Sequence, residues 1–139
     1  MLRTLGNILD ILTMAVGALG SISLLVGGVG IVTIMTIAVA ERTSEVGLML
    51  ALGAQRRTIL GLFLGEAVVL AALGGIAGLV LGVGLAQLIH LFVPALPVHT
   101  PMLYAVLAIV LASLIGLAAG VLPARRASRL DPVESLRAE

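Results

Sequence analysis

Long apolar stretches constrain this chain more than any other feature. The stretch from Ile11 to Ala40 contains no Asp, Glu, Lys or Arg, and Glu66 is the only such residue between Arg57 and Arg125. Hydrophobic residues make up 60% of the chain and charged residues 11%, whereas a soluble domain is about one quarter charged. Backbone groups in lipid must be hydrogen-bonded within their own segment, so each apolar stretch is expected to be a helix. The sequence therefore predicts an all-α, polytopic membrane protein with one membrane domain, residues 1–139.

Three transmembrane helices are predicted, at about residues 15–40, 59–90 and 102–122. A charged loop at 41–57 joins the first two, and a turn rich in proline and histidine joins the last two. Pro123 is expected to end the third span, because proline is a poor residue for a helix interior. A charged tail, 124–139, follows it.

The first apolar helix is too long for the membrane. From Leu5 to Ala40 it would extend about 54 Å, against a hydrocarbon core of about 30 Å. It is therefore expected to project outside the membrane. Its outer part has an apolar seam at alternating steps of three and four residues, formed by Leu2, Leu5, Leu9, Leu12, Val16 and Leu19. Two interpretations stay open: one face of an ordinary buried helix, or a stalk that packs on another helix.

Charge predicts the orientation and limits the chemistry. All arginines except Arg3 lie in the loop or the tail, so both are expected in the cytoplasm and the N-terminus outside. The chain has no lysine for a P-loop and no cysteine for a disulfide or a thiolate metal site. Nothing in the sequence resembles a nucleophile–base pair or a catalytic carboxylate pair, so we expect no enzymatic activity and no cofactor. A net charge of +1 gives no reason to expect a nucleic-acid partner.

The loop ERTSEVGLMLALGAQRR, from Glu41 to Arg57, is predicted to form a helix, a turn and the start of the next helix. Ser44 is the expected N-cap and Gly53 the expected residue after the C-cap. The short helix between them is apolar on more than one side, so it requires either the bilayer interface or a protein partner. Both interpretations stay open from these residues alone.

The tail is expected to anchor the chain at the inner membrane surface through Arg125, Arg126 and Arg129. Asp131 and Pro132 then resemble the start of a short amphipathic helix, with Val133 and Leu136 on one face. A simple membrane-surface anchor would also explain this pattern.

Glycines at four-residue spacing predict close helix packing. They are Gly61 and Gly65, Gly74, Gly78 and Gly82, and Gly116 and Gly120. Packing within the chain and self-association between chains would both explain this glycine spacing.

For Glu66, a proton-relay role is one hypothesis, and an ion pair with an arginine such as Arg57 is another. His90 and His99 have no third ligand nearby in sequence, so a metal site is not expected.

Three segments together resemble a known family. They are LLVGGVGIVTIMTIAVAERTSEVGLMLALGAQRRTIL, EAVVLAALGGIAGLVLG and LPARRASRLDPVESLRAE. They resemble the C-terminal transmembrane region of FtsX-like ABC transporter permeases, in the branch of the MacB type. The resemblance implies four spans, with an extracytoplasmic domain between the first and second, of which this chain would supply the last three.

The same resemblance implies a function in the cytoplasmic membrane. The loop would dock on an ABC ATPase, the long first helix would be one leg of a stalk, and ATP-driven motion would be transmitted to the outside for export or extracytoplasmic work. The partners implied are the ATPase, a second copy in a homodimer, the lipid bilayer and an extracytoplasmic domain or adaptor. The expected ATPase contacts are Glu41, Arg42, Glu45, Val46, Gly47, Leu52, Gly53 and Ala54. The alternative is a truncated or structural membrane protein that self-associates through its glycine-rich helices.

Overall fold

The computed structural model of the protein describes residues 2–94 and 102–137, and these form five helices. The helices are α1 (Leu2–Glu41), α2 (Thr43–Ala51), α3 (Arg56–Phe92), α4 (Met102–Ser128) and α5 (Pro132–Arg137). The three long ones are apolar enough to cross a membrane, which confirms the predicted fold class. Pro97, His99 and Pro101 of the predicted outer turn lie outside the described residues.

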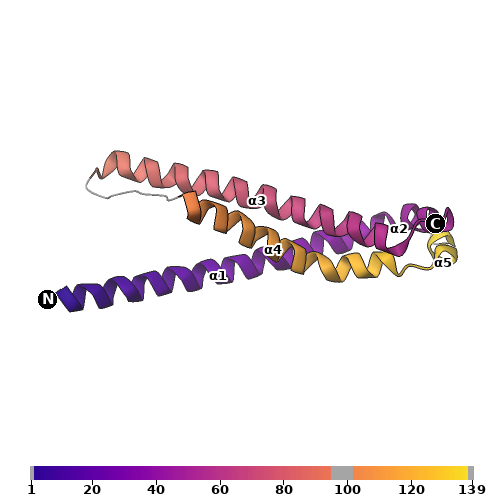
Figure 1. Ribbon diagram of the computed structural model, residues 1–139, viewed down its shortest axis with the longest axis horizontal. Coiled ribbons are helices and arrows are strands. Elements are labelled where there is room, and N and C mark those ends of the chain that lie inside the picture. Colours follow the sequence, from indigo (N-terminus) through magenta and orange to yellow (C-terminus); the bar gives the residue numbers. More distant parts are fainter. Residues whose placement is uncertain (1, 95–101, 138–139) are drawn as a thin grey trace.

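The long helices form an elongated, V-shaped bundle (Figure 1). Helices α3 and α4 run antiparallel and pack on each other most extensively, and α1 packs mainly on α4. Towards its N-terminus α1 diverges from the α3–α4 hairpin, whereas α2 and α5 lie together at the opposite end. Both short helices therefore sit where the three long ones converge.

Small residues allow α3 and α4 to approach closely. A Cβ atom added at Gly116 would overlap the side chain of Ala71 and lie 3.0 Å from the carbonyl oxygen of Ala67. One added at Gly120 would overlap Ala67. A Cβ at Gly75 would lie 3.0 Å from the Cβ of Ala112. Because contact distances this short leave no room for another carbon, these positions set the register of the hairpin.

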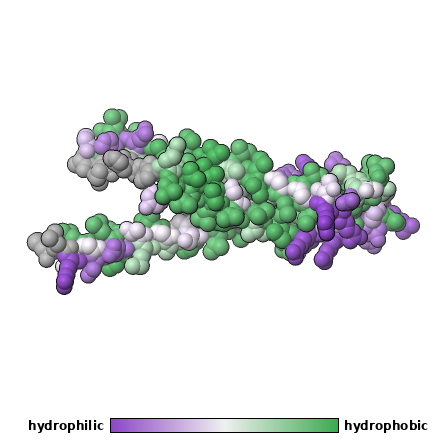
Figure 2. All heavy atoms as spheres, viewed as in Figure 1, coloured by the Kyte–Doolittle hydropathy of each residue, from purple (hydrophilic) through white to green (hydrophobic). Residues whose placement is uncertain are grey.

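The buried core lies at the converging end and includes residues of four helices. Its members are Met35 and Val39 of α1, Val46 of α2, Ile59, Phe63 and Ala67 of α3, and Ala124 and Ala127 of α4. Elsewhere the long helices expose most of their large apolar side chains, and apolar atoms dominate the middle of the surface in Figure 2. An apolar surface of this extent suits a lipid environment rather than water.

One expectation about a helix end differs from the structure. Pro123 does not end α4, which continues to Ser128. Proline cannot donate a hydrogen bond to the carbonyl of Ala119, but Pro123, Ala124 and Ala127 are all buried, so packing offsets the lost bond. The long first helix is confirmed as one uninterrupted helix of 40 residues, while its projection beyond the membrane remains a prediction.

The apolar seam on α1 is uncovered in this chain. Leu5, Leu9, Leu12, Val16 and Leu19 are all exposed, so the interpretation as an ordinary buried face is wrong for the chain by itself. The side chain of Leu2 lies outside the described residues. The stalk interpretation stays a prediction.

The close approach of α3 and α4 can be tested with a single methyl group. Gly116→Ala is expected to lower the free energy of unfolding by about 1–3 kcal/mol, because the added carbon must displace Ala71. Gly61→Ala on α3 is the matched control, since its added methyl meets no atom within 4 Å. It should leave stability unchanged or raise it by up to about 1 kcal/mol. Unfolding in mixed detergent, followed by circular dichroism, measures both; equal behaviour of the two variants would contradict the proposed packing.

Candidate functional site

The short helix α2 follows α1 after a single intervening residue. The Arg42 N–H donates to the Ala38 carbonyl at 3.1 Å, and the Val46 N–H donates to the Arg42 carbonyl at 3.0 Å. The Thr43 hydroxyl donates to the carbonyl of Val39 at 2.9 Å. The prediction of Ser44 as N-cap is wrong: Arg42 occupies the cap position without a side-chain bond. Backbone bonding on both sides of Arg42 makes a separate side-chain cap unnecessary.

The C-terminal end of α2 is a tight glycine turn. The Gly53 N–H donates to the Leu50 carbonyl at 3.1 Å, and the Ala54 N–H donates to the Met49 carbonyl at 2.9 Å. This pair of bonds defines a Schellman motif, whose residue after the C-cap requires a left-handed backbone. Gly53 supplies it with a φ of 95°, which confirms its predicted role. The chain therefore reverses within a few residues and enters α3 at Arg56.

Burial divides α2 into an inner and an outer face. Val46 is 1% exposed and packs in the core, and Gly47 is buried beside it. On the outer face, Leu48 is 52% and Leu52 79% exposed, and Glu45 is also exposed. The helix is thus held by one face and presents apolar side chains on the other.

The expected ATPase contacts therefore fall into two groups. Val46 and Gly47 face the interior, so in this conformation they hold α2 in place and present no surface to a partner. Ala54 is half-buried. The other expected residues are exposed, namely Glu41, Arg42, Glu45, Leu52 and Gly53. Leu48, which the expected set omitted, is exposed on the same helix.

An ion pair connects the α1–α2 junction to α3. An Nη atom of Arg42 lies 3.7 Å from an Oε atom of Glu66. The interpretation of Glu66 as the partner of an arginine is confirmed, but the arginine is Arg42, at the junction of α1 and α2, and not Arg57. Both side chains are partly exposed, at 54% for Arg42 and 38% for Glu66, so the ion pair stabilises the fold by no more than about 1 kcal/mol.

Arg42 and Glu66 also line a small cleft of about 180 Å³ between α2 and α3. The other lining residues are Glu45, Val46, Met49, Leu62 and Phe63.

The tail helix α5 lies against α2. The Val133 N–H donates to the Asp131 carboxylate at 2.9 Å, which confirms the predicted helix start. Leu130, just before it, is half-buried and packs against the core. The side chain of Leu136 lies outside the described residues. Arg125, Arg126 and Arg129 are exposed near the end of α4, and their role as a membrane anchor remains a prediction.

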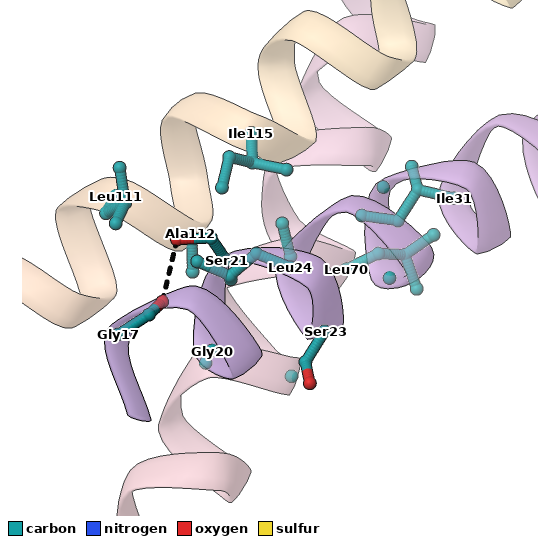
Figure 3. A pocket seen from close by; sticks show the side chains of 15 residues that line it. Gly17, Gly20, Ser21, Ser23, Leu24, Ile31, Leu70, Leu111, Ala112 and Ile115 are labelled. Atoms are coloured by element: carbon teal, nitrogen blue, oxygen red, sulfur yellow. Dashed lines mark hydrogen bonds between the residues drawn. The ribbon is translucent and has the colours of Figure 1, made fainter. Parts of the chain in front are cut away.

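The predicted glycine positions differ in their surroundings. Gly116 and Gly120 lie against α3, as described above, whereas no atom would meet a Cβ at Gly74, Gly78 or Gly82. Gly74 lines a groove of about 770 Å³ between α1, α3 and α4, shown in Figure 3. Gly78 and Gly82 line a second groove of about 390 Å³. Any packing role of these three requires something from outside the chain.

Sequence reasoning missed the partners of Gly116 and Gly120. They are Ala67 and Ala71, which lie four residues apart in α3 and are followed by Gly75 at the same spacing. This run of small residues was the available signal. Across residues 2–94 and 102–137, no group of three His, Cys, Asp or Glu side chains is arranged to hold a metal ion.

These features define a multi-pass helical membrane protein with a short, turn-locked helix at one end. A family model described as FtsX-like permease C-terminal matches residues 17–132. The chain therefore belongs to the FtsX-like permease family, and its relatives place it with the MacB type.

Three relatives show the extent of the similarity. The macrolide export ATP-binding/permease protein MacB of Wolinella succinogenes is 47% identical over 132 residues, which is 92% of this chain and 20% of that protein. MacB of Rhodospirillum rubrum is 48% identical over 128 residues, 92% of this chain and 19% of its own length. MacB of Marinobacter nauticus is 40% identical over 139 residues, 100% of this chain and 21% of its own length. The chain thus spans about a fifth of the length of these relatives.

Replacing Gly53 tests the turn that ends α2. Gly53→Ala is expected to lower the free energy of unfolding by about 1–3 kcal/mol, because a residue with a Cβ atom is strained at this φ. Apart from its two neighbours in the chain, no atom of the described residues would lie within 4 Å of the new Cβ, so any loss of stability reports backbone strain rather than a clash. Thermal unfolding in detergent measures it. A fully stable Gly53→Ala variant would contradict the left-handed turn.

The ion pair is tested by a double-mutant cycle of Arg42→Glu and Glu66→Arg. Each single change places two like charges together and should lower the free energy of unfolding. The double variant, in which both charges are reversed, should recover most of that lost stability. The expected coupling energy is about 0.5–1 kcal/mol and should shrink in high salt. Additive effects of the two changes would mean that Arg42 and Glu66 do not interact.

Proposed function

We propose that the chain is the membrane component of an ABC transporter of the MacB or lipoprotein-release type. It would transmit ATP-driven motion of a partner ATPase across the membrane, for export or for work on the outer side. The observation that carries the proposal is the division of α2 into a buried face, held by Val46, and an exposed face with Leu48 and Leu52. Such a helix is suited to receive a partner and pass its displacement to the core behind it.

Family membership and the names of the relatives support the same proposal. Those relatives are named ATP-binding/permease proteins, so one chain there combines both parts. The 139 residues here contain no lysine, and a Walker A motif requires one. ATP hydrolysis would therefore take place on a separate ATPase subunit or domain.

The core suggests how a displacement would travel. Val46 packs in one cluster with Met35 of α1 and with Ile59 and Phe63 of α3. Close-packed interiors transmit strain, so a push on α2 would reach the C-terminal end of α1. Helix α1 is about 60 Å long and only its C-terminal part is packed, so a small rotation near Met35 becomes a large movement at its far end.

The proposed orientation places this far end outside the cell membrane and α2 and α5 in the cytoplasm. The arginines near α2 and α5 support it through the positive-inside rule. The exposed seam of α1 would then pack on another helix of a stalk, with an extracytoplasmic domain or adaptor beyond it. Assembly as a homodimer is part of the proposal, because it would bring two such seams together.

The proposal is tested by tagging the C-terminus, extracting the protein in mild detergent and identifying what co-purifies. An ABC ATPase with a Walker A motif is the expected partner. Leu52→Asp should reduce its recovery by about tenfold, since a carboxylate would be buried against an apolar surface. Leu91→Asp is the matched control: Leu91 is also an exposed leucine, but it lies near the C-terminal end of α3, far from α2.

Two results would contradict the proposal. One is recovery of the chain alone or only with copies of itself, which would favour a self-associating structural protein. The other is recovery of an ATPase that Leu52→Asp does not reduce, which would place its binding site elsewhere.

A further inference from the structure

The contacts between α3 and α4 follow a single register. The three pairs that define it are Gly75 and Ala112, Ala71 and Gly116, and Ala67 and Gly120. From each pair to the next, α3 goes back four residues and α4 advances four, as two antiparallel helices of equal rise must. The same steps, continued to the converging end, give the residues of the two helices that lie at one level.

This register places one arginine of each helix near the same level. It sets Arg126 of α4 level with Gly61 of α3, and Arg57 lies four residues before Gly61. Arg57 and Arg126 are therefore separated by about 6 Å along the bundle, at about 1.5 Å per residue. Both side chains are exposed and long enough to reach one common ligand.

Arg57 and Arg126 also lie on the same side of the α3–α4 hairpin. Arg57 lies 18 residues before Gly75, which is five turns at about 3.6 residues per turn, so it shares the face that Gly75 presents to Ala112. Arg126 lies 14 residues after Ala112, close to four turns, and so lies near the matching face of α4. Arg125 is also exposed, but it is rotated by about 100° from Arg126.

The acidic side chains of this end lie elsewhere. Glu66 is the only acidic residue in α3 and α4. It lies nine residues after Arg57, which is two and a half turns, so it is on the opposite side of α3, where it pairs with Arg42. The other described acids of this end belong to α1, α2 and the tail beside α2, namely Glu41, Glu45, Asp131 and Glu134. Arg57 and Arg126 therefore form a positively charged pair on the side away from the cleft at α2.

Apolar residues continue from this arginine pair towards the middle of the bundle. Leu64 and Val68 follow Arg57 at about two and three turns, and Ala119 precedes Arg126 by about two turns. All three are half-buried. At Gly61, between the arginines and these residues, an added Cβ would meet no atom within 4 Å. The pair thus marks the polar end of an apolar surface on two helices that are long and apolar enough to cross a membrane.

We propose that Arg57 and Arg126 together bind the phosphate of an anionic phospholipid, whose acyl chains lie along Leu64, Val68 and Ala119. Guanidinium groups bind phosphate oxygens with two parallel hydrogen bonds, and basic sites between membrane helices bind anionic headgroups. The amine of a zwitterionic headgroup would be repelled by the two arginines, so an anionic lipid is preferred. The inference needs only insertion in a membrane and does not depend on the proposed coupling to an ATPase.

The natural chain has no tryptophan, so a single one can report the lipid beside it. Gly61→Trp places the reporter level with Arg126, and Leu81→Trp places a control at a position of α3 that is 67% exposed and far from both arginines. Each is reconstituted in nanodiscs in which either phosphatidylglycerol or phosphatidylcholine is brominated, because bromine quenches tryptophan fluorescence. Quenching should show a preference of about tenfold for phosphatidylglycerol at position 61 and none at position 81.

Arginine variants in the Gly61→Trp chain separate a site from general charge attraction. Arg57→Gln and Arg126→Gln should each reduce the preference by about fivefold. Arg125→Gln is the matched control: it removes the same charge from the adjacent exposed arginine and should leave the preference unchanged. Equal losses in all three variants, or equal preference at positions 61 and 81, would overturn the inference. Loss of the preference on adding inorganic phosphate at constant ionic strength would indicate a small-anion site and would also overturn it.

Native mass spectrometry tests the chain without an added tryptophan. The natural chain, released from nanodiscs of both lipids, should retain phosphatidylglycerol. The double variant Arg57→Gln, Arg126→Gln should lose this lipid, whereas Arg125→Gln should keep it. Retention by the double variant, or no retention by the natural chain, would contradict binding of the lipid at these two arginines.

Discussion

The close approach of α3 and α4 is the contact on which the rest of the structure depends. Gly116 and Gly120 let the backbone of α4 lie against Ala67 and Ala71 of α3. Lipid tails are as apolar as these side chains, so hydrophobic burial gives the pairing little drive, and close van der Waals contact must supply it. The hairpin that results is the surface on which α1 packs, mainly through α4.

At the converging end the hairpin supports a different kind of packing. Larger side chains, such as Met35, Ile59 and Phe63, fill the space between the helices there and bury Val46 of α2. Because α2 is fixed on its inner face and ended by the turn at Gly53, its outer face has a defined orientation. In the proposed function, a helix held in this way would transfer force to α1, which a loose loop could not do.

Much of the architecture was predictable because only a few backbone structures can satisfy their hydrogen bonds in lipid. Apolar length predicted three membrane helices, and the spacing of Gly53 and of Asp131 predicted two local motifs that the structure contains. The prediction that Pro123 ends the third span was wrong, because burial of Pro123 and its neighbours outweighs the poor fit of proline in a helix interior. The prediction of Ser44 as the N-cap of α2 was wrong, because α1 runs almost directly into α2.

The sequence by itself determined the membrane class, the long first helix and the glycine turn, because each depends on hydrophobicity or backbone geometry within one segment. Only the tertiary structure decided that Glu66 pairs with Arg42, that α5 lies against α2, and that the glycines of α4 are packed while Gly74 lines an open groove. These features depend on how helices distant in sequence are aligned. Spacing along one helix indicates which residues share a face, but the neighbour of that face is set by the register and crossing of the helices in space.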